Sequence, residues 1–477
     1  MKLTRRDFIK AGLGSFAYLS ASAAVPTWVA KSAHGLSQGQ FDDRILVIVQ
    51  MGGGNDGLNT VIPYQDDLYY NARPVLGQRS GIHTLDDLNA LHPSMNNLKN
   101  WYDDGYMALL QNVGYPNPNL SHFLSTDYLE FGASPNSELQ PGDKGWVMRF
   151  FDNACAGVAP EDIPALSILA LNTSQLPDAL SGSESYLPPR VSNLDDFSVR
   201  TGTDLRAKYL STLNRLTVPN NDLDYIQRVE NVAEATVAEF EEASETADLR
   251  DYPSGRLGGG LRNISKLIRS GRETKVYYCS QGGYDNHANQ RGEHASLLDN
   301  LDNSLDAFLS DMRDSGNLHK VLVLTFSEFG RRVNENGSAG TDHGGANCLM
   351  ALGGGVNGGI YGGQPDLRED SLIRGNLSHA VDFRAIYSNV IADWFGEDAS
   401  AVFGADFTDP IFQIPAGMAM APFVNLNPSA VVGGEGEGEG EGEGEGEGEG
   451  GGTGGGGSGG GGTGGGGTST PAGCAMP

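Results

Sequence analysis

Short apolar runs alternate along this chain with longer stretches in which apolar residues recur at helical spacing. The runs span residues 44–50, 106–113, 165–170, 275–280, 321–326 and 348–352. Their continuous apolar character is typical of strands that are covered on both faces of a sheet. Helical patterns occupy residues 88–101, 294–312 and 383–395. Strand followed by helix, repeated, predicts an α/β fold with a mainly parallel sheet and helices on both faces.

Residues 205–267 depart from this rhythm. One apolar stripe with acidic flanks predicts a long amphipathic helix; it consists of Ile226, Val229, Val232, Val237 and Phe240. A second helix is expected over residues 261–269, after three consecutive glycines. We therefore expect a helical insert at about residues 200–270, lying over one sheet edge or over the functional site.

Both ends of the chain differ from the rest in composition. Arg5 and Arg6 precede a mild apolar stretch at residues 11–24, which is the twin-arginine export pattern. We expect residues 1–33 to be a signal peptide that the twin-arginine translocase recognises, and the mature protein to be periplasmic, extracellular or on the cell surface. Residues 41–425 would form the folded domain. Residues 430–477 are a Glu-Gly repeat and a Gly-rich run, which cannot bury apolar surface and should be disordered.

Charge and cysteine content exclude several classes of protein. The formal net charge is −28, and it stays strongly negative without the tail glutamates, so a nucleic-acid partner is not expected. Four cysteines are too few for a disulfide scaffold. Beyond the signal peptide, no apolar run is long enough to predict a transmembrane span.

Polar clusters lie where several predicted strands end or begin. Their members are Asn55 and Asp56, Asp285 and His287, Glu328, and Asp342 and His343. The carboxyl ends of parallel strands meet at one edge of a sheet, where an α/β fold builds its site. Carboxylates together with imidazoles suit zinc, manganese or iron. The sequence therefore predicts one metal site assembled from distant segments.

Asp285 and His287 give the sharpest signal, because residues two apart in an extended segment point to the same side and can reach one ion. The alternative is a turn-capping Asp beside an unrelated surface His. Turn capping is also the alternative for Asp56. Residues 52–57 match a dinucleotide-binding fingerprint, but Pro63 interrupts the helix that this fingerprint needs, and no acidic residue lies near the expected ribose position, so that site is not favoured.

Glu328 and His343 have two interpretations each. Glu328 could bind the metal while Arg331 or Arg332 holds an oxyanion, or Glu328 and Arg331 could form a structural ion pair. His343 is interpreted as a ligand, with Asp342 either ligating or orienting an imidazole; the alternative is a polar loop.

Ser121 and His122 form a further candidate pair after a predicted strand. Ser121 could be a nucleophile, with His122 beside it as a ligand or proton carrier. An ordinary helix N-cap is the alternative for Ser121.

Together these motifs resemble the domain-of-unknown-function 1501 family, exported bacterial proteins grouped with the alkaline phosphatase and sulfatase superfamily. The likeness covers about residues 41–395. Its most specific pieces are Gly-Gly-x-Asp-Gly-Leu-Asn, Ser-His-Phe, Gly-Gly-Tyr-Asp-Asn-His, Ser-Glu-Phe-Gly-Arg and Thr-Asp-His-Gly-Gly.

The resemblance implies an alkaline-phosphatase-like three-layer fold and one or two divalent ions, which could be zinc, manganese, iron or calcium. Asp56 and Glu328 would serve one ion. Asp285, His287 and His343 would serve the other, and Asn55 and Asp342 would support the ligands. Ser121 would lie between the ions as the nucleophile, with His122 and Arg331 as its catalytic neighbours.

The sequence thus favours an exported metal-dependent hydrolase that acts on phosphate or sulfate esters, with a small anionic ester as substrate. The competing interpretation is a catalytically silent extracellular binding or assembly protein on the same fold. A nucleotide-dependent oxidoreductase is the least favoured of the three.

Overall fold

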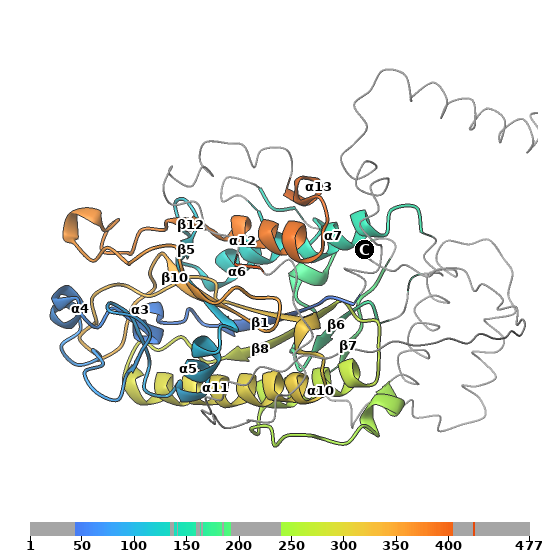
Figure 1. The fold of residues 1–477 in the computed structure, drawn as a ribbon. Coiled ribbons are helices and arrows are strands. Elements are labelled where there is room, and N and C mark those ends of the chain that lie inside the picture. Colours follow the sequence, from blue (N-terminus) through green and yellow to red (C-terminus); the bar gives the residue numbers. More distant parts are fainter. Residues whose placement is uncertain are drawn as a thin grey trace, which may run out of the picture.

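The computed structural model describes residues 43–133, 138–140, 142–158, 163, 166–183, 186–191, 240–403 and 423–424 (Figure 1). A nine-stranded sheet crosses this part of the chain, in the order β11-β5-β10-β9-β1-β8-β6-β7, with β12 also paired to β5. Its strands are β1 (Ile45–Gly52), β5 (Met107–Gly114), β6 (Ile168–Leu171), β7 (Arg190–Val191), β8 (Val276–Gly282), β9 (Val321–Phe326), β10 (Asn347–Leu352), β11 (Gly359–Tyr361) and β12 (Val381–Asp382).

All six apolar runs of the sequence form strands of this sheet. Every pairing is parallel except those of β10, which runs antiparallel to both β5 and β9. Leu46 and Ile48 of β1 belong to the core on one face, and Val47 and Val49 belong to the core on the other. Because successive side chains of a strand point to opposite faces, both faces of the sheet are buried.

Helices cover both faces, so the predicted three-layer α/β fold is confirmed (Figure 1). One face carries α5 (Asn96–Asp103), α10 (Arg256–Arg269) and α11 (Gln290–Asp314). The other carries α6 (His122–Phe131), α7 (Trp146–Ala154), α12 (Phe383–Asn389) and α13 (Ala399–Phe403). The pattern at residues 88–101 is helical only from Asn96, since Pro93 lies in the first half and residues 90–91 form a strand.

Shorter elements complete the described fold. A small antiparallel sheet has the order β2 (Val61–Ile62), β4 (Ala90–Leu91) and β3 (His83–Thr84). The remaining helical segments are α3 (Gly57–Thr60), α4 (Asp67–Ala72), η2 (Asp178–Leu180), η3 (Leu318–Lys320), η4 (Glu369–Ser371) and the π-helical η5 (Val390–Trp394). Among the described residues, no helix combines the length and the apolar character needed to cross a bilayer.

Only part of the expected helical insert can be compared with the structure. Residues 192–239 lie outside the described residues, as do the predicted signal peptide and the predicted C-terminal tail. Helix α10 packs on the face of the sheet beside α11, and it begins at Arg256, so the three glycines lie inside it. A Cβ at Gly258 would come within 2.1 Å of the carbonyl oxygen of Pro253, which explains why glycine is needed there.

The loops after β1, β8 and β9 meet at one edge of the sheet, since these three strands are adjacent and parallel. Gly53 and Gly54 follow β1 with φ angles of 117° and 73°, which side chains other than hydrogen rarely tolerate. A Cβ on Gly53 would lie 2.6 Å from the amide nitrogen of Asp285, and one on Gly54 would lie 2.4 Å from the ring of Phe329. The glycines therefore allow the three loops to pack directly against one another.

Candidate metal centre

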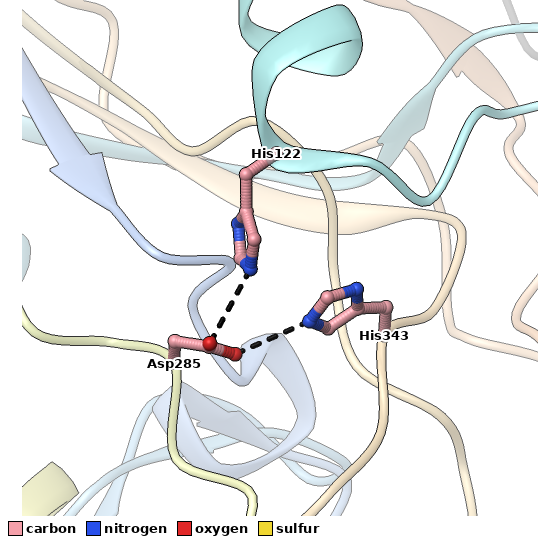
Figure 2. A group of neighbouring side chains, drawn as sticks. All are labelled: His122, Asp285 and His343. Atoms are coloured by element: carbon pink, nitrogen blue, oxygen red, sulfur yellow. Dashed lines mark hydrogen bonds and ion pairs between the residues drawn. The ribbon is translucent and has the colours of Figure 1, made fainter.

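Four side chains converge at this edge of the sheet: His122, Asp285, His287 and His343. Figure 2 shows three of them, with both imidazole rings directed at the Asp285 carboxylate. Oδ1 of Asp285 lies 3.2 Å from Nε2 of His343 and 3.0 Å from Nε2 of His287. Oδ2 of Asp285 lies 3.4 Å from Nε2 of His122. The Nε2 atoms of His287 and His343 are 3.0 Å apart.

The four residues come from three different segments of the fold. His122 is the first residue of α6. Asp285 and His287 lie in the loop after β8, and His343 lies in the segment that leads into β10. The separation of 58 residues between Asp285 and His343 is closed by the folding of the sheet.

The other ring nitrogen of each imidazole faces an oxygen. Nδ1 of His122 lies 2.7 Å from Oε1 of Glu328, and Nδ1 of His343 lies 2.7 Å from the carbonyl oxygen of Leu120. Nδ1 of His287 lies 3.5 Å from Oδ1 of Asp342. Because carbonyl and carboxylate oxygens only accept hydrogen bonds, Nδ1 must carry the hydrogen in His122 and His343. In these neutral imidazoles, the Nε2 lone pair faces the centre of the cluster.

This arrangement fits a divalent cation. Facing acceptor atoms repel one another unless a proton or a cation lies between them. Nε2 of His122 is buried and has no hydrogen-bond partner among the residues that the structure describes. Ligands at zinc-nitrogen distances of 2.0–2.1 Å form a tetrahedron with edges of about 3.3 Å. Oδ1 of Asp285 lies 3.0 Å from Nε2 of His287 and 3.2 Å from Nε2 of His343. His122 approaches the other oxygen, Oδ2, at 3.4 Å, and the ligand atoms of His122, Asp285 and His343 all lie within 4.8 Å of one another.

The charge of Asp285 is stabilised by a buried guanidinium. Partial burial opposes ionisation, but the hydrogen bond from Arg331 prevails and lowers the pKa of Asp285 below its usual value. Its side chain is 46% exposed, so the cluster opens to solvent. The hydrogen bond to Glu328 raises the pKa of His122 above its ordinary value.

Arg331 is placed differently from the sequence prediction of a group that holds a substrate oxyanion. Nε donates to the carbonyl of Gly54 at 2.6 Å, and Nη1 donates to the carbonyl of Thr341 at 2.9 Å. Nη2 donates to Oδ1 of Asp285 at 2.8 Å and also to the carbonyls of Tyr284 and Gly53. All three nitrogens are thus engaged within the protein, and Arg331 ties the loops of the site together.

Asp56 is also placed differently from its predicted role as a ligand. Its carboxylate is buried, pairs with Nη1 of Arg73 at 2.6 Å, and accepts from Nε2 of Gln290 at 2.5 Å. Burial opposes its ionisation, but Arg73 keeps the pKa of Asp56 below its usual value. The carboxylate is therefore satisfied by protein groups, and the structure does not bring it to the cluster.

Glu328 and Asn55 lie behind the cluster. Glu328 is 3% exposed and accepts from the backbone N–H of Gly53 at 2.9 Å as well as from His122. Asn55 is fully buried; its backbone N–H donates to Oγ of Ser327 at 2.8 Å, and its Oδ1 lies 3.0 Å from Nε2 of His294. The sequence predicted that Asp56 and Glu328 share a second ion, whereas the described residues bring one group of ligands together.

Ser121 lies at the N-cap position of α6, but its hydroxyl makes no capping hydrogen bond. The side chain is exposed, and the backbone N–H donates to Oδ1 of Asn119 at 2.8 Å. Phe123, on the other side of His122, is 84% exposed, although large apolar side chains are usually buried. Beneath the cluster, the buried ring of Phe329 packs against His122 and His343.

Sequence reasoning missed two contributions to this site. Arg73 follows α4, in a segment without a recognisable motif, and only the folded chain shows that it faces Asp56. The backbone carbonyl of Leu120 orients His343, and a backbone contact of this kind cannot be predicted from the type of residue. Phe329, directly after Glu328, could have been found from the sequence as an apolar residue within a polar loop.

One family model matches part of the chain. Residues 187–386 match the family model described as "Protein of unknown function (DUF1501)". This range contains Asp285, His287, Glu328 and His343, but not His122. No curated protein matches the sequence.

Several solved structures are similar over much of their length. The lipoteichoic acid synthase LtaP from Listeria monocytogenes is 9% identical, with 69% of this chain and 71% of that chain covered and a TM-score of 0.34. The phosphonate monoester hydrolase SpPMH from Silicibacter pomeroyi is 9% identical, with 75% of this chain and 74% of that chain covered and a TM-score of 0.33. The PsFucS1 sulfatase from Pseudoalteromonas sp. is 10% identical, with 72% of this chain and 70% of that chain covered and a TM-score of 0.32.

The strand order and the layers described above define the fold. The match to the family model agrees with the expectation from the sequence motifs. Over residues 187–386, less than half of its length, this chain is similar to the family of proteins of unknown function DUF1501.

Proposed function

We propose that this protein binds one divalent cation between His122, Asp285, His287 and His343 and hydrolyses phosphate or sulfate esters with it. The observation that supports the proposal is the convergence of three imidazole Nε2 atoms on one carboxylate, with a buried and unsatisfied Nε2 on His122. Such an arrangement is costly for a folded protein unless a cation occupies it.

The ligand types narrow the choice of ion. Three imidazole nitrogens and one carboxylate suit zinc, iron or manganese. Calcium is disfavoured, because it takes six to eight oxygen ligands. Asp56 and Glu328 are satisfied by Arg73, by Gly53 and by His122, so we propose one ion.

A bound cation would polarise an ester oxygen and stabilise the charge that develops on it. The chain itself supplies the nucleophile in this proposal. The hydroxyl of Ser121 is exposed, makes no capping hydrogen bond, and is adjacent in sequence to His122. Its oxygen would attack phosphorus or sulfur as the bond to the leaving oxygen breaks. The serine proton passes to water, and the leaving oxygen gains a proton. A second water then attacks phosphorus or sulfur, the bond to Oγ of Ser121 breaks, and Oγ regains a proton as the inorganic anion leaves.

Export is a further part of the proposal. The twin-arginine pattern at residues 1–33 lies outside the described residues, so it supports the proposal from sequence alone. We propose that the twin-arginine translocase carries the protein to the periplasm or the cell surface, where small anionic esters would reach an open cluster.

Elemental analysis of the purified protein, together with hydrolysis of an aryl phosphate and an aryl sulfate, tests the proposal. We expect about one equivalent of a transition metal and metal-dependent turnover of one ester, both lost in Asp285→Ala. Asp366→Ala removes an exposed carboxylate that pairs with Arg368 and should change neither result. Activity that survives Asp285→Ala would defeat the catalytic proposal, and stoichiometric metal without turnover would support the non-catalytic binding protein.

A further inference from the structure

We infer that Glu328 is a positioning residue that holds the imidazole of His122 with Nε2 toward the cation, and is not itself a ligand. The inference rests on the proposed metal site. Oε1 of Glu328 lies 2.7 Å from Nδ1 of His122, while Nε2 of the same ring lies 3.4 Å from the Asp285 carboxylate. One ring therefore connects a buried carboxylate on one side with the cluster on the other.

The Glu328 carboxylate is held rigidly. The backbone N–H of Gly53 lies 2.9 Å from Oε1 and 3.2 Å from Oε2, and the hydroxyl of Ser327 lies 3.3 Å from Oε2. The carbonyl of Glu328 also accepts from Oγ of Ser125, on the same helix as His122, at 2.9 Å. A carboxylate fixed at its backbone and its oxygens can fix the ring that donates to it.

The hydrogen on Nδ1 decides whether His122 can bind a cation. A neutral imidazole carries its hydrogen on one nitrogen, and the other nitrogen has the lone pair that a metal needs. Glu328 accepts from Nδ1 and so leaves the lone pair on Nε2. Without that acceptor, the ring would be free to rotate or to place its hydrogen on Nε2.

Glu328 differs from the groups that orient the other two imidazoles. His343 is oriented by the backbone carbonyl of Leu120, which no substitution removes. Asp342, which faces Nδ1 of His287 at 3.5 Å, is exposed and also accepts from Asn336. Glu328 is thus, among the described residues, the buried side chain that accepts from the Nδ1 of an imidazole in the cluster.

Zinc titration of the full-length protein tests the inference. In Glu328→Met, which removes the acceptor at similar length, the zinc dissociation constant should rise 10- to 100-fold, the usual cost of losing a group that orients a metal-binding histidine. Glu335→Met is the matched control: Glu335 also accepts from backbone N–H groups, those of Val75 and Leu76, but it does not contact the cluster. Its zinc affinity should equal that of the wild type.

Nitrogen-15 NMR of the histidine rings in the metal-free protein gives a second readout. We expect hydrogen on Nδ1 of His122 in the wild type and a loss of that preference in Glu328→Met, with His343 unchanged in both. The inference is overturned if a folded Glu328→Met binds zinc as tightly as the wild type, or if His122 carries its hydrogen on Nε2 in the wild type. A wild type that binds no zinc defeats the proposed function, whereas the NMR result still decides the role of Glu328.

Discussion

Two carboxylates, Asp56 and Asp285, follow the adjacent parallel strands β1 and β8 but have opposite surroundings. Asp56 is buried against the fully buried Arg73, and its oxygens are satisfied by protein donors. Asp285 is 46% exposed, and three imidazole nitrogens lie within 3.4 Å of its oxygens. Each carboxylate has a guanidinium partner, Arg73 for Asp56 and Arg331 for Asp285. The other neighbours differ: Gln290 donates to Asp56, whereas imidazole nitrogens face Asp285, which is therefore the carboxylate that we propose binds a cation.

The largest effect is expected from breaking the Asp56–Arg73 pair. Arg73→Met leaves the Asp56 carboxylate buried without its cation, and we expect the free energy of unfolding to fall by about 3–5 kcal/mol. Urea denaturation measures this free energy in the wild type and the variant. Arg368→Met is the control, because it removes an exposed partner of Asp366 and should leave the free energy of unfolding nearly unchanged. Equal losses in the two variants would contradict the structural role of the buried pair.

Asp285 should affect stability only through the metal. Zinc at 100 times its dissociation constant should raise the free energy of unfolding of the wild type by about 2.7 kcal/mol. Chelator should reverse this gain, and Asp285→Asn should abolish it. Thermal or urea unfolding with and without zinc measures the difference. The comparison with Asp56 fails if zinc stabilises Asp285→Asn as much as it stabilises the wild type.

Glu130 provides a third case, a buried carboxylate with neither a guanidinium nor an imidazole beside it. Burial raises its pKa to about 7, although Tyr278 and the N–H of Asp178 donate hydrogen bonds to it. Since the folded pKa lies above the unfolded value, its contribution is complete below about pH 4.5 and is lost as the pH rises through 7.

Glu130→Gln should remove this pH dependence, which we expect to amount to about 2 kcal/mol between pH 5 and pH 8. Urea unfolding of the wild type and of Glu130→Gln across that pH range measures the difference in pH dependence. A wild type and a variant with parallel pH profiles would show that Glu130 is ionised in the folded protein.

The smallest effect is expected at Phe123. Its ring is 84% exposed, so Phe123→Ala should change the free energy of unfolding by less than about 0.5 kcal/mol. Phe329→Ala, in contrast, removes the buried ring beneath His122 and His343 and should cost about 3–5 kcal/mol. A comparable loss in both variants would mean that Phe123 is buried in solution.

The sequence predicted the central strands well because continuous apolar runs such as that of β1 leave few alternatives to a strand covered on both faces. It could not predict that β10 runs antiparallel, since an apolar run has no direction. Nor could it distinguish a proposed ligand from the group behind it. Glu328 and Asp285 both follow strands, but Asp285 reaches the centre of the cluster, whereas Glu328 contacts the ring of His122 from the other side. The role of Arg73 could not be predicted from the sequence, because its pairing with Asp56 depends on tertiary packing alone.

Anomalous X-ray scattering from crystals of the zinc-loaded protein would test the central claim most directly. The account predicts one zinc peak, about 2.0–2.1 Å from Nε2 of His122, His287 and His343 and in contact with the Asp285 carboxylate. No peak at this cluster, or a peak bound by Asp56 and Glu328 instead, would contradict it.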